Sequence, residues 1–168
     1  MELMKDVCDN IYVYGSAGIG KSRYMKLHME KLGFSLYIKE INKWWCNYVN
    51  QDAVLLDDLD PDNMKRVTDV KTWLDHYKFN ADIKGSMVCI RPQKVIVTSN
   101  YLPHELGMRD DGITLPKFMR MFKNAVWTVR IKGESMGCSA QELAPDNSDD
   151  VFYKHRELCE IEYNFNGK

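Results

Sequence analysis

Eight consecutive residues near the start of the chain have the types and spacing of a phosphate-binding loop. Glycines permit the backbone angles that turn successive N–H groups toward an anion, and a helix that begins directly after them adds its positive dipole end. The closing lysine then reaches the β- and γ-phosphates of a nucleotide, and the hydroxyl after it ligates Mg²⁺. The alternative is a chance glycine turn, which the strand pattern before the loop and the helix pattern after it disfavour. The complete template G-x-x-x-x-G-K-[ST] is met by Gly15, Ser16, Ala17, Gly18, Ile19, Gly20, Lys21 and Ser22.

Polar side chains also follow two apolar runs further along the chain. Asp57 and Asp58 come directly after one run, and Asn100 comes after the other. Continuous apolar runs indicate strands buried on both faces, as in parallel sheets, and ligands of such sheets gather at the carboxyl ends of the strands. Asp57 would then hold Mg²⁺ through water, and Asp58 would orient and deprotonate an attacking water. Asn100 would sense the γ-phosphate or position that water, with a simple turn cap as an equal alternative.

The composition limits the classes of protein. A chain of 168 residues, with 45% hydrophobic and 28% charged residues, can form one globular domain with a sizeable core. No apolar run approaches the roughly 20 residues of a membrane span, and the five scattered cysteines indicate neither a disulfide framework nor a zinc site. The net charge of −1 means that any contact with nucleic acid must be local.

Hydrophobic periodicity predicts alternating strands and helices, followed by a part that is harder to assign. We expect strands over residues 11–14, 34–38, 53–58, 94–100 and 125–131, helices over 22–32, 63–77 and 116–122, and a hairpin over 79–91. Thr114 is expected to cap the last helix. Residues 101–114 and 133–150 are expected to be loops, and the segment 151–165 could be helix or strand.

In chain order the motifs are the phosphate loop, N-K-W-W at residues 42–45, the paired aspartates, K-G at residues 84–85 and T-S-N at residues 98–100. This combination resembles the superfamily 3 helicase domain of replication initiator (Rep) proteins from circular single-stranded DNA viruses, in the circovirus-like branch, over about residues 12–131. The resemblance implies an α/β P-loop NTPase fold (AAA+-like), with a central, mainly parallel sheet flanked by helices and an inserted B′ hairpin. It also implies an ATP- and Mg²⁺-dependent helicase that moves along single-stranded DNA during rolling-circle replication.

The resemblance assigns roles to particular residues of this chain. Gly15 to Ser22 match Walker A, Asp57 and Asp58 match Walker B, and Asn100 matches the sensor of motif C. Lys84 and Gly85 fall in the hairpin that grips DNA, and Arg120 lies at the place of an arginine finger for a neighbouring subunit's ATP. The chain departs from the family in three places: Met121 follows Arg120 where a second arginine is frequent, Ser16 replaces a frequent proline, and Cys46-Asn47 stand where relatives often have Asp-Gly.

Family members carry an N-terminal nicking endonuclease and assemble as homo-oligomers, usually hexameric rings. Only eleven residues precede Tyr12, so we expect that endonuclease to be missing here, and this chain alone could be a monomer. We expect an ATPase and helicase core over residues 1–132 and a C-terminal extension over residues 133–168. The resemblance implies action inside the cell, in the host nucleus, and without a membrane.

Two other functions stay open at this point. A small-molecule kinase with a P-loop would need an acceptor pocket and usually an arginine-rich lid, and the sequence shows no such lid. A non-catalytic module for DNA binding or assembly could use the loop only to hold nucleotide. The intact set of Lys21, Ser22, Asp57 and Asp58 argues against that second alternative.

Overall fold

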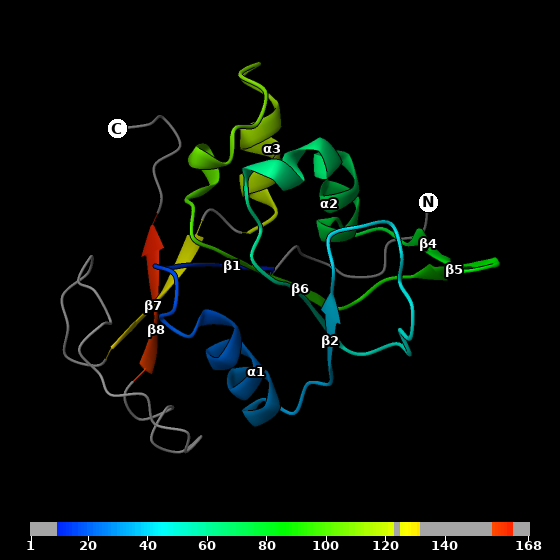
Figure 1. The fold of residues 1–168 in the computed structure, drawn as a ribbon, viewed down its shortest axis with the longest axis horizontal. Helices are drawn as coiled ribbons and strands as arrows, with labels where there is room; N and C mark the ends of the chain where they lie inside the picture. The colour runs from blue at the N-terminus through cyan, green and yellow to red at the C-terminus, as the bar shows by residue number, and fades with distance from the viewer. Residues whose placement is uncertain (1–9, 123–124, 132–155, 163–168) are drawn as a thin grey trace.

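A six-stranded sheet organises the part of the chain that the computed structural model describes, which is residues 10–122, 125–131 and 156–162. The strand order is β2-β3-β6-β1-β7-β8 (Figure 1). Neighbouring strands are parallel from β2 to β7, and β8 is antiparallel to β7. This is the α/β P-loop NTPase fold with a mainly parallel sheet that the sequence predicts. The strands are β1 (Ile11–Tyr14), β2 (Leu36–Lys39), β3 (Ala53–Leu56), β6 (Lys94–Ser99), β7 (Ala125–Ile131) and β8 (Arg156–Glu162).

Helices cover both faces of the sheet, with α1 (Lys21–Lys31) on one side and α2 (Val67–Leu74) and α3 (Thr114–Arg120) on the other (Figure 1). Successive strand residues alternate between the two faces because the side-chain period of a strand is two. Tyr12 therefore packs with the residues of α2 and α3, and its neighbour Val13 packs with those of α1. Burial on both faces explains why the strands read as continuous apolar runs.

The core on the side of α2 and α3 is the larger and the more aromatic. Trp45 is 1% exposed and contacts the rings of Trp73 and Phe79, at centroid distances of 5.6 Å and 5.5 Å. Tyr12 meets Phe118 and Phe122 edge-on. These contacts attach α2, α3 and the segment between β2 and β3 to the same face of the sheet.

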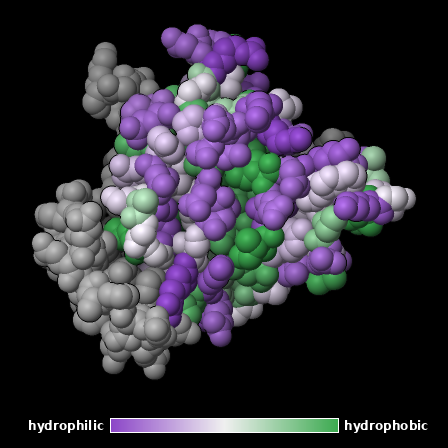
Figure 2. Space-filling view, viewed as in Figure 1, coloured by the Kyte–Doolittle hydropathy of each residue, from purple (hydrophilic) through white to green (hydrophobic). Residues whose placement is uncertain are grey.

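The hairpin predicted over residues 79–91 is present as β4 (Phe79–Ile83) and β5 (Ser86–Ile90). Gly85 in its turn has a φ of 83°, which favours glycine. The hairpin extends away from the body of the molecule (Figure 1), and hydrophilic and hydrophobic residues alternate over its surface (Figure 2). On its other edge, β4 is bridged to the segment before β3, where Trp44 pairs with Asp82.

The single helix predicted over residues 63–77 is wrong in its extent. A 3₁₀ helix occupies Pro61–Arg66 and α2 follows it, so the helical path begins earlier and ends at Leu74. Asp60 caps the start by accepting from the backbone N–H of Asn63 at 3.3 Å, and Pro61 follows in the position that favours helix initiation. At the other end, the Arg91 guanidinium donates to backbone carbonyls of the last turn of α2 and of the residues that follow.

Three other elements refine the sequence predictions. The last helix is α3, which Thr114 begins rather than caps: the N-cap residue is Ile113, and the carboxylate of Asp111 accepts from the backbone N–H of Thr114 at 2.8 Å. These hydrogen bonds, with those from Ile113 and the Thr114 hydroxyl, lower the pKa of Asp111 to about 2. The undecided segment 151–165 contains β8, which extends the main sheet. The loop predicted over residues 133–150 lies outside the described residues.

Within the described ranges, every helix is too short or too polar to cross a membrane.

Candidate nucleotide site

The phosphate loop joins the end of β1 to the start of α1. Its first glycine is fixed against the sheet, because the Gly15 N–H donates to the carbonyl of Ser99 at 3.2 Å. A side chain there would crowd Ile19, whose Cγ2 would lie 3.1 Å from an added Cβ. Gly20, with a φ of 93°, adopts the left-handed backbone that begins α1. The loop therefore needs glycine at its ends, while Ser16, Ala17 and Gly18 lie exposed at its mouth.

Lys21 is only 5% exposed and contacts both the loop and the end of a distant strand. Its Nζ donates to the carbonyls of Gly15 and Ser16, each at 3.0 Å, and to the side-chain oxygen of Asn100 at 2.7 Å. Burial lowers the pKa of Lys21 below its ordinary value, and the carboxylates of Asp58 and Asp57 oppose that shift. The predicted convergence of Lys21 and Asn100 is present.

The residues predicted to hold Mg²⁺ also meet. The Ser22 hydroxyl donates to Oδ1 of Asp57. Hydroxyl and carboxylate oxygens are the hard ligands that Mg²⁺ takes, and the ion usually keeps several waters and uses phosphate oxygens for its remaining positions. In the residues that the structure describes, no cluster of three or more His, Cys, Asp or Glu could hold a metal. The Ser22–Asp57 pair offers two oxygen ligands, which fits a Mg²⁺ that completes its coordination with waters and nucleotide phosphates.

Thr98 is a site residue whose role the sequence prediction missed. Its hydroxyl donates to Oδ1 of Asp57 at 2.8 Å and accepts from the backbone N–H of Asp58 at 2.9 Å. Its carbonyl accepts from the N–H of Leu59 at 2.8 Å. These bonds hold Asp58 in a left-handed backbone with a φ of 54° and leave its carboxylate exposed beside the site. The one indication in the sequence was that the T-S-N triplet opens with a hydroxyl residue, Thr98, which is fully buried here.

Lys84 and Arg120 lie on other elements than the loop. Lys84 is exposed in the turn of the β4–β5 hairpin, next to Gly85. Arg120 is exposed at the last residue of α3, and its Nε donates to the carbonyl of Pro116 at 3.4 Å. Neither residue takes part in the hydrogen bonds that join Lys21, Ser22, Asp57 and Asn100. Any role they have is therefore at a surface of the chain.

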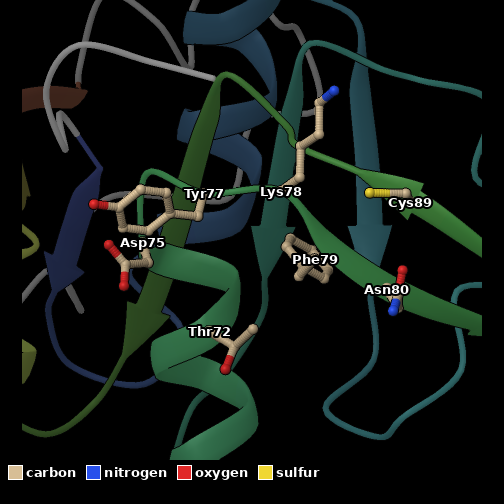
Figure 3. A pocket seen from close by; sticks show the side chains of 7 residues that line it. All are labelled: Thr72, Asp75, Tyr77, Lys78, Phe79, Asn80 and Cys89. Atoms are coloured by element: carbon tan, nitrogen blue, oxygen red, sulfur yellow. The ribbon is translucent and has the colours of Figure 1, made fainter. Parts of the chain in front are cut away.

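A hollow of about 600 Å³ lies elsewhere, between the end of α2 and the base of the hairpin (Figure 3). Phe79 and Tyr77 give it aromatic walls, and Asp75 stands at its edge below Tyr77. The carboxylate and the negative end of the α2 dipole would both repel phosphate. Lys78 also lines the hollow, but its lining residues include no glycine-rich turn that could cradle a triphosphate as the loop at residues 15–22 can.

Comparison with known proteins agrees with the motifs. A model of the RNA helicase family matches residues 11–101. The chain is 30% identical to the replication-associated protein of canary circovirus over 117 residues, which is 70% of this chain and 38% of that protein. It is 31% identical to the replication-associated protein of beak and feather disease virus over 115 residues, 68% of this chain and 37% of that protein. The chain thus spans less than two fifths of the length of these curated relatives.

One solved structure, described as the crystal structure of DNA replication initiation factor, aligns with 69% of this chain and 39% of its own. Its sequence identity is 17% and its TM-score is 0.36.

The position of Thr98 leads to a test by two substitutions. Thr98→Val keeps the volume but leaves the Asp58 N–H without its acceptor and removes a donor from Asp57. We expect it to weaken binding of a fluorescent ATP analogue in the presence of Mg²⁺ by about tenfold, since a lost buried hydrogen bond costs about 1–3 kcal/mol. Thr98→Ser keeps the hydroxyl and should bind nearly as the parent does. Equal affinity of the Val variant and the parent would show that Thr98 does not position the aspartates.

Proposed function

The chain belongs to the RNA helicase family and is similar to circovirus replication-associated proteins, and from these premises we propose that it is the ATP-hydrolysing motor of a viral replication initiator that moves on single-stranded DNA. The observation that carries the proposal is the meeting of two residue pairs at one edge of the sheet. Lys21 contacts Asn100, and Ser22 contacts Asp57, across 79 and 35 positions of sequence.

Each group at this edge has a part in hydrolysis. The glycine loop and Lys21 would hold the β- and γ-phosphates, and Ser22 and Asp57 would hold the metal. Mg²⁺, when bound with ATP, would neutralise the charge that develops on the phosphate oxygens. Asp58 orients the attacking water and accepts its proton, because its carboxylate is exposed next to Asp57. Asn100, whose side-chain oxygen accepts from Lys21, would sense the γ-phosphate by donating from its side-chain amide nitrogen.

Two further residues act between chains or on DNA. Arg120 is exposed at the end of α3, and we assign it as the arginine finger that would act on the nucleotide of a neighbouring copy in a homo-oligomeric ring. Lys84 and Gly85 form the exposed turn of a hairpin that stands away from the body of the molecule (Figure 1). An exposed ammonium on such a turn can contact the phosphates of single-stranded DNA. The chain has a net charge of −1, so this contact must be local.

Phosphate release from ATP tests the activity directly. The parent chain should release phosphate in the presence of Mg²⁺, and the rate per molecule should rise with protein concentration, because an arginine finger supplied by a neighbour contributes about 10³ to 10⁵ in rate. Lys21→Ala should abolish release while circular dichroism shows an unchanged fold. Nucleotide binding without phosphate release at every concentration, with or without single-stranded DNA, would instead favour a non-catalytic module.

Salt dependence tests the place of Lys84 on the DNA path. Lys84→Ala should weaken binding to an oligothymidine and lower the slope of log affinity against log salt by about 0.7, the effect of one lost phosphate contact with a single strand. Basal phosphate release should not change. The matched control is Lys26→Ala, which removes an exposed lysine from α1 on the opposite face of the sheet. The same slope for Lys84→Ala and the parent would remove Lys84 from the DNA path.

A further inference from the structure

Lys39, the last residue of β2, is a lysine inside the core. Its side chain is 1% exposed. Its Nζ donates to the backbone carbonyls of Glu40 and Asn42, each at 2.6 Å, and lies 3.5 Å from the side-chain oxygen of Asn42. All of these acceptors are uncharged. The buried ammonium is therefore stabilised by oxygen dipoles rather than by a hydrogen-bonded carboxylate.

Two indole rings complete the surroundings of this ammonium. Nζ lies 4.6 Å from the ring centroid of Trp73 on α2 and 5.1 Å from that of Trp45. The two rings meet edge-on, with an angle of 88° between their planes. A cation within about 6 Å of an indole face is attracted by the ring quadrupole. Through these two rings, Lys39 connects helix α2 with the turn that follows β2.

Burial of this charge is unfavourable for folding. Desolvation lowers the pKa of Lys39 to about 8. The facing charged and titratable groups are Glu40, Asp69 and Cys46, which raise the pKa, and Arg66, which lowers it. Replacement of even a buried ion pair by apolar side chains of similar volume is often neutral or stabilising, so a buried charge is weak evidence for a stabilising role. A gain in stability is therefore not the expected reason for a lysine here, and the contacts of the turn that it holds point to a positioning role.

That turn is paired with the first strand of the hairpin, β4. The N–H of Trp45 donates to the carbonyl of Asp82 at 2.9 Å, and Trp44 forms a parallel bridge with the same residue. Asp82 lies in β4, two residues before Lys84. The two carbonyls that converge on the Lys39 ammonium belong to residues 40 and 42, directly before this bridge. A shift of the turn would therefore move the edge of β4 that is bridged to it.

We propose that Lys39 is a positioning residue for the β4–β5 hairpin: its ammonium fixes the turn of residues 40–45, and the turn fixes β4 and with it the exposed Lys84. The part of the proposal that concerns DNA rests on the proposed function. Lys39 touches neither nucleotide nor DNA and acts only through the turn. Loss of its charge should leave the fold and the nucleotide site intact while the hairpin loses its fixed position.

The substitution Lys39→Met in the full chain separates positioning from a structural role. Methionine keeps the length and removes the charge. We expect the urea midpoint to stay the same or rise, and basal phosphate release to be unchanged. Affinity for a fluorescent oligothymidine should fall by at least about fivefold, the size of a modest coupling between sites. The control Lys26→Met, at an exposed lysine of α1, should change none of these. Unchanged DNA affinity in Lys39→Met would overturn the proposal, and so would a parallel loss of stability and DNA affinity.

Hydrogen exchange gives a readout that does not depend on DNA. In Lys39→Met, amides of residues 79–90 should exchange faster, while those of β1 and β6 keep their protection. This result would support the positioning role even if the parent chain failed to bind DNA, in which case the proposed function alone would fail. Unchanged exchange in the hairpin would refute the positioning role.

The lowered pKa of Lys39 predicts how the stability and the DNA affinity change with pH. Because the pKa in the folded protein, about 8, lies below the ordinary value of 10.5, the buried ammonium lowers stability at pH values below 8, and that penalty diminishes as the pH rises from 8 toward 10.5. Over the same rise the turn loses its cation. DNA affinity of the parent should therefore fall as the pH passes through 8, and Lys39→Met should lack that step. A step of equal size in both proteins would assign it to another group.

Discussion

The parallel pairing of β1 with β6 and of β6 with β3 is the constraint on which the site depends. Ile96 pairs with Ile11 on one side and with Leu55 on the other, so three strands end at the same edge. That register places the Lys21 ammonium within 2.7 Å of Asn100 and the Thr98 hydroxyl within 2.8 Å of Asp57. A slip of one residue would turn Thr98 to the other face of the sheet and separate these groups.

The two cores on either side of the sheet enforce this register. Each of the three central strands sends alternate side chains to the α1 side and to the side of α2 and α3, and nearly all of these are buried. A shift would exchange side chains of different size between two packed layers, which dense protein interiors resist. The larger core also contains Trp45 and Trp73, so the segment that meets the hairpin is attached to the same packed body as the nucleotide site.

Much of this arrangement could be predicted from sequence because its signals are local. The glycine template defines the loop by itself, and polar residues directly after apolar runs locate the edge of the sheet. The helical path begins at Pro61 because Asp60 and Pro61 form a capping signal that apolar periodicity does not contain. The change from a 3₁₀ to an α helix after Arg66 has no side-chain cap to mark it. Lys39 could not be recognised as buried, since a lysine at the end of a short strand usually faces solvent. Its burial depends on Trp45, which lies in a segment without regular secondary structure, and on Trp73, which is far from Lys39 in the sequence. Thr98 was hidden within a recognised triplet, because its hydroxyl matters only through a turn 40 residues away.

The central claim is that the edge formed by Lys21, Ser22, Asp57 and Asn100 binds a metal-bound triphosphate. Titration calorimetry of ATP with and without Mg²⁺, on the parent chain and on Asp57→Asn, tests it most directly. We expect a single site on the parent whose affinity falls when Mg²⁺ is removed, and an Asp57→Asn variant whose weaker affinity no longer responds to Mg²⁺. Equal affinity with and without Mg²⁺ on the parent, or an unchanged Mg²⁺ response in the variant, would contradict the account.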